Sequence, residues 1–266
     1  MTQMLTSRQN TLVKEIRKLH AAKVRHETGL FLLEGTHLLE EACGVNYRLE
    51  TVCCTPAWQD SHQELWQVCC RSAARSQIVS KEVLKALATT VEPDGVVATA
   101  KRLQMPPPTL PTSLALGLET IQDPGNLGTI IRTAAAAGAS GLFLSRDSVD
   151  LDHPKVLRSS AGQWFKMPMA VTKDLLLLVQ SAKQKGMQAI ATVPDAKLTY
   201  WEIDWHQPSL IVLGNEGSGL SADLIAECSS CCRIPLSPGV ESLNVALAAA
   251  LILYEARRTR TNGQGG

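Results

Sequence analysis

The second half of the chain alternates short apolar runs with segments whose apolar residues recur at helical spacing. The apolar runs predict β-strands at residues 114–119, 141–145, 167–171, 188–193, 209–213 and 233–236. The helical patterns lie between them, at residues 128–137, 154–161, 173–185, 222–228 and 243–258. This alternation predicts an α/β domain with a mostly parallel sheet covered by helices on both faces. Ligands of such sheets bind beyond the carboxyl ends of the strands.

The first half has a smaller α/β pattern. Leu12, Ile16 and Leu19 recur at helical spacing after a polar cap at Thr6 or Ser7, which predicts an amino-terminal helix. Short strands are predicted at residues 31–33, 51–54, 77–79 and 96–98. Helices between these strands would complete a small α/β sandwich.

A proline-rich segment separates the two halves. Four prolines fall within residues 105–111, and proline biases its neighbours toward extended backbone while it removes a hydrogen-bond donor. At 266 residues, the chain exceeds one typical domain. We therefore expect a first domain at residues 1–104, a linker at 105–113 and a second domain at 114–266.

Overall charge gives no signal for nucleic acid. The net charge is +1, and 45% of the residues are hydrophobic against 19% charged, so the chain can bury a core and is not disordered. Basic residues do cluster within a helix predicted between residues 8 and 25, where Glu15 is the one acid. A basic helical face can contact phosphates, although a run of charge is more often ordinary solvated surface.

Eight cysteines follow an amino terminus that lacks the apolar core of a signal peptide. Reduced thiols in the cytoplasm are the simplest interpretation. Cys228 and Cys231 could form half of a zinc site, but no second pair stands at a usual spacing, so we expect no metal. The longest apolar run, residues 245–254, is shorter than the roughly 20 residues that cross a bilayer, so we expect no membrane partner.

Three segments share a design in which a glycine turn and polar side chains stand beside apolar runs. They are residues 122–132 (QDPGNLGTIIR), 210–221 (LIVLGNEGSGLS) and 236–255 (LSPGVESLNVALAAALILYE). The third places polar residues directly before a long apolar helix. A helix start has unpaired N–H groups and a positive dipole end, so it can hold a polar or anionic ligand. Serine and asparagine are also ordinary helix caps, so this segment alone would indicate only a well-capped buried helix.

In this order and spacing, the three segments resemble the motifs of the SpoU (TrmH-like) RNA 2′-O-ribose methyltransferases of the SPOUT superfamily. Residues 31–42 (FLLEGTHLLEEA) also resemble the amino-terminal RNA-binding domain of many members. The resemblance implies a carboxyl-terminal, trefoil-knotted methyltransferase domain and a smaller α/β RNA-binding domain similar to ribosomal-protein folds. It also implies S-adenosylmethionine as methyl donor, RNA as partner and a homodimer formed through helices near the knot.

The resemblance assigns roles to individual residues. It implies a catalytic set of Asn126, Arg132, Glu216, Ser242 and Asn244. The methyl-donor pocket would use Thr192, Val193, Leu213, Gly214, Ile234, Leu236 and Leu243. RNA contacts in the first domain are expected from Arg8, Lys14, Arg17, Lys18, Glu34 and His37.

Arg132 is central in this interpretation, because the family's matching arginine contacts substrate phosphate or ribose and has been regarded as a base. A guanidinium stays protonated, with a pKa above roughly 12. We therefore favour a clamp on phosphate and hydroxyl over a base. Glu216 could orient Arg132 or accept a hydrogen bond from the substrate. The ordinary alternatives are an exposed surface cation and a helix cap.

These features predict an S-adenosylmethionine-dependent RNA methyltransferase that modifies a ribose 2′-hydroxyl, with ribosomal RNA favoured by the extra RNA-binding domain. Transfer RNA as substrate, or a noncatalytic RNA-binding protein with the same fold, are the alternatives. A nucleotide or nicotinamide enzyme is disfavoured, because Gly214, Gly217 and Gly219 do not form the GxGxxG order. The sequence does not identify the modified nucleotide.

Overall fold

The computed structural model describes residues 4–102 and 113–262. The chain divides into two compact units. The first contains Met1–Met105 and Asp150–Phe165, and the second contains Pro106–Val149 and Lys166–Gly266. Most of the predicted proline-rich linker lies outside the described residues. The grouping of Asp150–Phe165 with the first unit is a feature that the sequence pattern did not predict.

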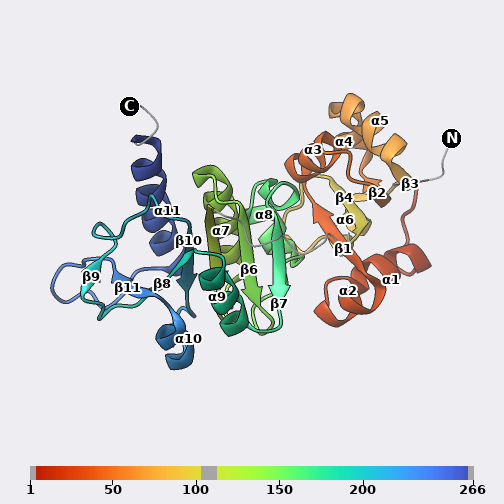
Figure 1. Cartoon of the computed structure of the whole chain (residues 1–266). Helices are drawn as coiled ribbons and strands as arrows, with labels where there is room; N and C mark the ends of the chain where they lie inside the picture. The colour runs from red at the N-terminus through yellow and green to blue at the C-terminus, as the bar shows by residue number, and fades with distance from the viewer. Residues whose placement is uncertain (1–3, 103–112, 263–266) are drawn as a thin grey trace. The chain divides into compact units, whose positions relative to one another are not determined.

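The first unit is built on a four-stranded sheet with the strand order β1-β4-β2-β3 (Figure 1). Its strands are β1 (Leu30–Glu34), β2 (Leu49–Cys54), β3 (Ala73–Ile78) and β4 (Val96–Lys101). Strand β4 runs antiparallel to both of its neighbours, and β2 pairs with β3 in parallel. All four predicted strands of this half are present, each longer than its apolar run.

Helices cover both faces of this sheet. They are α1 (Thr11–Lys18), α2 (Ala22–Thr28), α3 (Thr36–Gly44), α4 (Pro56–Ser61), α5 (Gln63–Ser72), α6 (Lys81–Leu87) and α8 (Pro154–Ser159), with a 3₁₀ turn η1 (Gln163–Phe165). Helices α1 and α6 pack against Leu32 and Val97 on one face. Helices α3 and α5 pack against Leu33 and Ala98 on the other, so the predicted α/β sandwich is confirmed.

The prediction of a single helix between residues 8 and 25 is wrong, because this segment forms two helices, α1 and α2. Asn10, rather than Thr6 or Ser7, caps α1 by accepting a hydrogen bond from the Leu12 N–H. The break is held by Arg25, whose guanidinium donates to the Leu19 and His20 carbonyls at the end of α1. Arg25 is therefore buried and does not belong to the basic surface.

The second unit is built on a seven-stranded sheet with the order β7-β6-β5-β10-β8-β11-β9. Its strands are β5 (Leu114–Leu118), β6 (Gly141–Ser145), β7 (Met169–Thr172), β8 (Gln188–Thr192), β9 (Leu198–Thr199), β10 (Ser209–Leu213) and β11 (Ser230–Arg233). Every strand pair is parallel, which confirms the predicted sheet type. Consequently, the carboxyl ends of these strands share one edge of the sheet.

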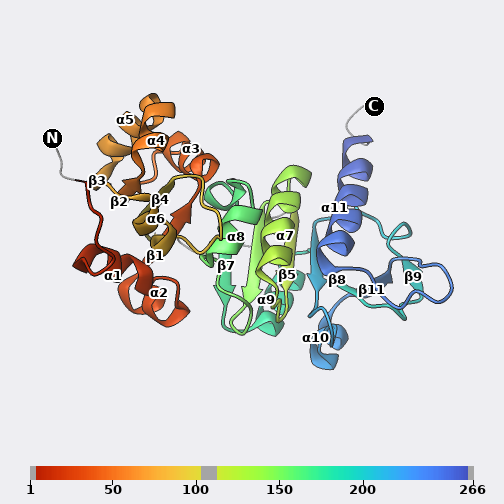
Figure 2. The same ribbon diagram turned by 180° about the vertical axis from the view of Figure 1, so that it is seen from behind.

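Four helices cover the second sheet. They are α7 (Pro124–Ala137), α9 (Leu175–Gln184), α10 (Ala222–Glu227) and α11 (Val245–Asn262). Helices α9 and α10 pack on one face, and α7 and α11 pack together on the opposite face (Figures 1 and 2). The described residues contain no helix that is both long and apolar enough to span a membrane.

Two local predictions differ from the structure. The last long strand was expected at residues 233–236, but β11 ends at Arg233. Pro235 has no N–H to donate to a strand ladder, so the pairing with β8 uses Cys231 and Cys232 instead. Strand β9 was not predicted, since its two residues are too few to form a pattern.

Candidate active site

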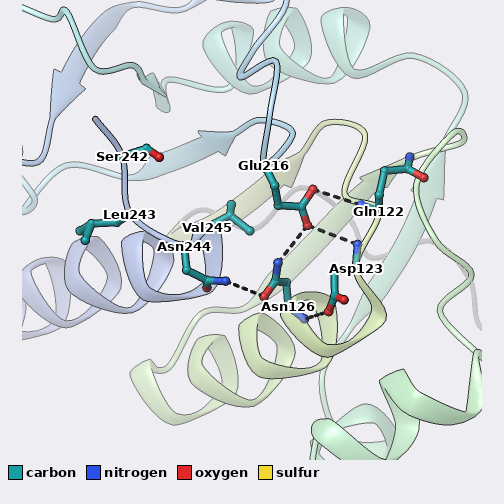
Figure 3. A pocket seen from close by; sticks show the side chains of 8 residues that line it. All are labelled: Gln122, Asp123, Asn126, Glu216, Ser242, Leu243, Asn244 and Val245. Carbon is teal, nitrogen blue, oxygen red and sulfur yellow. Dashed lines mark hydrogen bonds between the residues drawn. The ribbon is translucent and has the colours of Figure 1, made fainter. Parts of the chain in front are cut away.

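The three motif segments meet at the carboxyl edge of the second sheet. Their polar residues lie beyond the ends of β5, β10 and β11, and together they line an open pocket of about 590 Å³ (Figure 3). The pocket is lined by Gln122, Asp123, Asn126, Glu216, Ser242, Leu243, Asn244 and Val245. Four of the five predicted catalytic residues therefore line one pocket. Gln122, Asp123 and Val245 were not predicted as lining residues, although they lie within the quoted motifs.

The start of α7 positions Asn126. Asp123 is the amino-terminal cap, and its Oδ1 atom accepts hydrogen bonds from the N–H groups of Gly125 at 2.6 Å and Asn126 at 2.9 Å. Pro124 follows at the first helical position, where its fixed backbone angle favours the helix and no donor is lost. The cap thus places the Asn126 side chain on the first turn, facing the pocket.

The start of α11 positions Asn244 in a similar way. Its Oδ1 atom accepts hydrogen bonds from the N–H groups of Ala246 at 2.9 Å and Leu247 at 3.3 Å. Because the carbonyl oxygen of the side chain serves as the cap, its amide nitrogen is left to donate into the pocket. The sequence-based expectation of a capped helix and the expectation of a polar site residue are thus both met by one side chain.

A hydrogen-bonded relay joins the three motifs (Figure 3). The Nδ2 atom of Asn244 donates to Oδ1 of Asn126 at 2.9 Å, and Nδ2 of Asn126 donates to Oε1 of Glu216 at 3.0 Å. The N–H groups of Gln122 and Asp123 also donate to Glu216, each at 3.3 Å. All donors point toward the carboxylate, so the relay leads from the positive end of α11 to the charge on Glu216.

The relay sets the protonation of Glu216. Burial raises the pKa of this carboxyl, but hydrogen bonds from Asn126, from its own backbone and from the N–H groups of Asp123 and Gln122 outweigh that effect. The net pKa is below the ordinary glutamate value of 4.5. Glu216 is therefore ionised at neutral pH, where it can accept hydrogen bonds from a cation or a hydroxyl.

Arg132, the fifth predicted catalytic residue, lies on α7 but does not line the pocket. Its side chain is exposed, and it forms no hydrogen bond or ion pair with the residues that the structure describes. An unpaired guanidinium on the surface has all of its donors available for a phosphate.

The predicted donor-binding residues end three adjacent strands. Thr192 and Val193 lie at the end of β8, Leu213 and Gly214 at the end of β10, and Ile234 and Leu236 just beyond β11, while Leu243 lines the pocket. Strand β8 is hydrogen-bonded to both β10 and β11, so these ends lie side by side.

The Thr192 hydroxyl oxygen is suited to a ligand. It is buried and makes no hydrogen bond to the described residues, although the Cys232 thiol lies beside it. An unsatisfied buried hydroxyl is unfavourable, so a bound molecule with a hydrogen-bonding group would stabilise this site. The edge of adenosine and its ribose offer such groups, and the residues present therefore fit S-adenosylmethionine. No group of three His, Cys, Asp or Glu side chains suited to a metal occurs in residues 4–102 and 113–262.

The predicted RNA contacts of the first unit divide into two kinds. Arg8, Lys14, Arg17, Lys18 and His37 are exposed on or beside α1 and at the start of α3. Glu34 requires a correction: its side chain is only 3% exposed, pairs with Arg158 at 3.2 Å and accepts hydrogen bonds from Thr89 and Thr90. Because its oxygens are occupied inside the fold, Glu34 supports the structure and has no free surface for RNA.

Two protein-family models match this chain. The SpoU rRNA Methylase family model matches residues 113–254, and an MRM3-like substrate binding domain model matches residues 10–98. The chain belongs to the SpoU rRNA methylase family. The two matches cover the motif-bearing half and the smaller sandwich respectively.

Similar proteins span nearly the whole chain. An uncharacterised tRNA/rRNA methyltransferase of Synechocystis is 48% identical over 257 residues, which is 96% of this chain and 93% of the relative. The 23S rRNA (guanosine(2553)-2′-O)-methyltransferase RlmP of Bacillus subtilis is 33% identical, over 95% of this chain and 98% of its own. The crystal structure of an AdoMet-bound rRNA methyltransferase from Sinorhizobium meliloti has a TM-score of 0.84 at 31% identity, covering 96% of this chain and 97% of its own.

Proposed function

We propose that this protein transfers a methyl group from S-adenosylmethionine to a ribose 2′-hydroxyl in ribosomal RNA. The observation that carries the proposal is the Asn244–Asn126–Glu216 relay, which joins all three family motifs in one pocket. Relatives named as rRNA 2′-O-methyltransferases support the substrate class. Their names specify different bases, guanosine and uridine, so the proposal extends to the ribose and not to a particular nucleotide.

The proposed chemistry is an in-line displacement for which the bound donor would supply the methyl electrophile. The ribose 2′-oxygen would bond to the methyl carbon as the methyl–sulfur bond breaks, the sulfur would keep the electron pair of that bond, and the hydroxyl would give up its proton. The protein must hold the ribose oxygen about 3 Å from that carbon and exclude water. Thr192, Val193, Leu213, Gly214, Ile234, Leu236 and Leu243 would hold the donor against the strand ends.

Glu216 and Arg132 would contact different groups at the substrate. The ionised Glu216 carboxylate accepts a hydrogen bond from the ribose hydroxyl or from the Arg132 guanidinium. Arg132 clamps a neighbouring phosphate, a role for which an always-charged planar fork is well suited. Asn126 and Asn244 keep Glu216 oriented, and Ser242 offers a hydroxyl at the pocket wall.

The first unit would recognise the RNA. Its match to a substrate binding domain model supports this assignment, as do the exposed Arg8, Lys14, Arg17, Lys18 and His37. We propose that recognition depends on residues 1–104 and transfer on residues 114–266. Asp150–Phe165 is the exception, because it packs with the first unit.

A homodimer is proposed from the surface of α11. Leu247, Leu251 and Tyr254 are 57%, 42% and 51% exposed, and their spacing puts them on one face of the helix. A run of exposed apolar side chains of this kind is typical of a protein interface. A second copy of the chain, as the family resemblance implies, would cover it, and the trefoil knot near this helix remains part of the same proposal.

A cytoplasmic location is proposed from the cysteines and the substrate. All eight cysteines are free, including Cys43 and Cys69, whose thiols are hydrogen-bonded with the sulfur atoms 3.6 Å apart and form no disulfide. Free thiols fit a reducing compartment, which also contains ribosomal RNA.

The test is methyl transfer from labelled S-adenosylmethionine to separated ribosomal and transfer RNA, followed by nucleoside analysis for 2′-O-methyl products. We expect label in a ribose-methylated nucleoside of ribosomal RNA. Arg132→Ala should abolish transfer with little change in donor affinity measured by calorimetry, because Arg132 lies on α7, away from the ends of β8, β10 and β11 that are proposed to hold the donor. Lys185→Ala, which removes an exposed cation elsewhere in the second unit, is the matched control and should retain activity.

Label only in transfer RNA would move the substrate to the alternative class. RNA binding without transfer to unmodified transcripts of either kind would leave the protein as a noncatalytic RNA-binding member of the family. Full activity of Arg132→Ala would remove that residue from the catalytic set.

A further inference from the structure

The loop that carries Glu216 is attached to the end of β5 by a residue outside the predicted site. Glu119 directly follows β5, and its two carboxylate oxygens accept hydrogen bonds from the N–H and the hydroxyl of Ser221, each at 2.7 Å. The two residues are 102 positions apart in sequence. Charge-assisted hydrogen bonds of this length are among the stronger ones in proteins.

Ser221 is used here in an unusual way for its position. It is the amino-terminal cap of α10, where a serine hydroxyl normally accepts a hydrogen bond from the helix. In this protein the hydroxyl makes no such bond and donates to Glu119 instead. The Ser221 hydroxyl therefore attaches the loop to Glu119 and does not cap α10.

The other end of the loop has a second attachment. Asn215 donates from Nδ2 to the Thr120 carbonyl at 2.8 Å, while its Oδ1 accepts from the N–H groups of Gly217 and Ser218. The turn closes where the backbones of Asn215 and Gly219 exchange hydrogen bonds. Between the two attachments the loop is a preformed turn with Glu216 on it.

Gly214 lets this turn pack tightly. A Cβ atom at this position would lie 2.3 Å from the Gly219 backbone, so only glycine fits. The turn therefore behaves as one rigid piece, and its location depends on how its ends are held.

Glu216 itself is held less firmly than the ends of its loop. Asn126 donates to its carboxylate at 3.0 Å, whereas the N–H groups of Gln122 and Asp123 are 3.3 Å from its oxygens, beyond the usual range of about 2.7–3.2 Å. The stronger contacts are the two at Glu119. The location of the Glu216 carboxylate therefore depends on the attachments of its loop as well as on the Asn126 contact.

We propose that Glu119 is a positioning residue for methyl transfer: it fixes the loop of residues 214–221 against the β5 end and so keeps Glu216 aligned with Asn126 and the substrate. This inference rests on the proposed function. Glu119 acts through the loop and does not line the pocket. Loss of the contact leaves the first unit unchanged, so binding of RNA should be preserved while turnover falls.

The test compares Glu119→Ala, Glu119→Gln and Ser221→Ala with Glu202→Ala. Glu202 is a matched control, because its carboxylate also accepts from the N–H and hydroxyl of one residue, Thr199, at 2.7 and 2.8 Å. Two quantities are measured: amide hydrogen exchange of residues 214–221 in the free protein, and kcat and KM for RNA methylation.

We expect faster exchange of the loop in Glu119→Ala, and a fall in kcat on the order of 10- to 100-fold with little change in KM for RNA. Glu119→Gln keeps one acceptor oxygen and should recover part of the activity. The double variant Glu119→Ala/Ser221→Ala should be no worse than Glu119→Ala, because Glu119→Ala already removes both hydrogen bonds of the contact. Glu202→Ala should match the wild type in both measurements.

Unchanged exchange in Glu119→Ala would overturn the attachment, and faster exchange with full kcat would overturn the positioning role. An equal loss of kcat in Glu202→Ala would reduce the effect to general destabilisation and also overturn the proposal. Absence of transfer by the wild type would overturn the proposed function instead. The exchange measurement does not depend on methyl transfer, so it would still test the attachment of the loop.

Discussion

Asn126 connects the other polar residues of the pocket, since it accepts from Asn244 and donates to Glu216. Its two hydrogen bonds require an oxygen on one side and an N–H on the other, which only an amide provides at this size. The isosteric change to a carboxylate would place a negative charge 3.0 Å from Glu216. The orientation of the site is thus sensitive to one atom.

We expect Asn126→Asp to impair methyl transfer at neutral pH more than Asn126→Ala does. In the wild type, the pKa of Glu216 lies below the ordinary glutamate value of 4.5, so its carboxylate is ionised at neutral pH. The stability that its hydrogen bonds contribute is present above the unfolded pKa and is lost as the pH falls through the folded pKa. A second carboxylate raises that pKa. The acid limb of the pH–rate profile should therefore move to higher pH in Asn126→Asp.

The comparison is made by recording kcat against pH for both variants and the wild type. An acid limb at the same pH in all three proteins would contradict the assigned contact between Asn126 and Glu216.

At the same scale, the sequence indicated which polar residues gather at the pocket, but not which charged residues are buried. Asn126 and Asn244 were selected because their segments resemble the motifs of a known family, while the local glycine turn and helix start indicated only a cap or a turn; their catalytic roles stay predictions. The burial of Glu34 could not be predicted, because its partners Thr89 and Arg158 are far away in sequence. Single residues whose surroundings are made by distant segments need the tertiary structure.

Helix α11 has two different roles along its length. Its first residue, Val245, lines the pocket, and its inner face packs on α7, while Leu247, Leu251 and Tyr254 are exposed. The apolar run in the sequence predicted a buried helix without distinguishing these faces, since nearly every position in 245–254 is apolar. An interface could therefore not be separated from a core by pattern alone.

We expect Leu251→Glu to convert the proposed dimer to a monomer, because a charge would be buried without a partner at the interface. Sedimentation velocity measures the change directly. Leu177→Glu is the matched control: Leu177 is 60% exposed on α9, on the other face of the sheet, and its replacement should leave the assembly unchanged. A wild-type protein that sediments as a monomer at micromolar concentration would remove the dimer from the proposal.

Elements defined by alternation were predictable, and those defined by register or by very short length were not. The strand near residue 233 was placed too late because Ile234 and Leu236 extend the apolar run past Pro235, where the ladder must stop. Strand β9 contributes only two residues, Leu198 and Thr199, and is identified by its pairing with β11.

For the whole molecule, the least expected feature is the route of the chain between its two units. Residues 150–165 belong to the first unit and bring Leu157, Trp164 and Phe165 to its core. Asp150 and Asp152 also join a charged network in which Arg25 pairs with Asp150 at 2.7 Å and with Asp152 at 3.3 Å. No local pattern indicates that a segment following β6 completes the fold that contains β1.

We expect Arg25→Ala to lower the free energy of unfolding by about 3 kcal/mol. Asp152, only 2% exposed, would keep Arg102 but lose Arg25 as a partner, and the hydrogen bonds from Arg25 to the Leu19 and His20 carbonyls would also be lost. Urea unfolding followed by circular dichroism tests this value. Lys23→Ala, two positions before Arg25 on the same helix, removes an exposed ion pair with Glu27 and should have little effect on stability. Equal stability of the two variants would contradict a structural role for the Arg25 network.

The route of the chain has a consequence for how this protein is made and inherited. A ribosome synthesises the sheet of the first unit early, but that unit lacks its final core side chains until residue 165 has emerged. Completion of its core must therefore wait until the first strands of the second unit have been synthesised. A recombination event near residue 105 would separate β1–β4 from α8, so a gene fragment that ends there would encode the first unit without Leu157, Trp164 and Phe165 of its core.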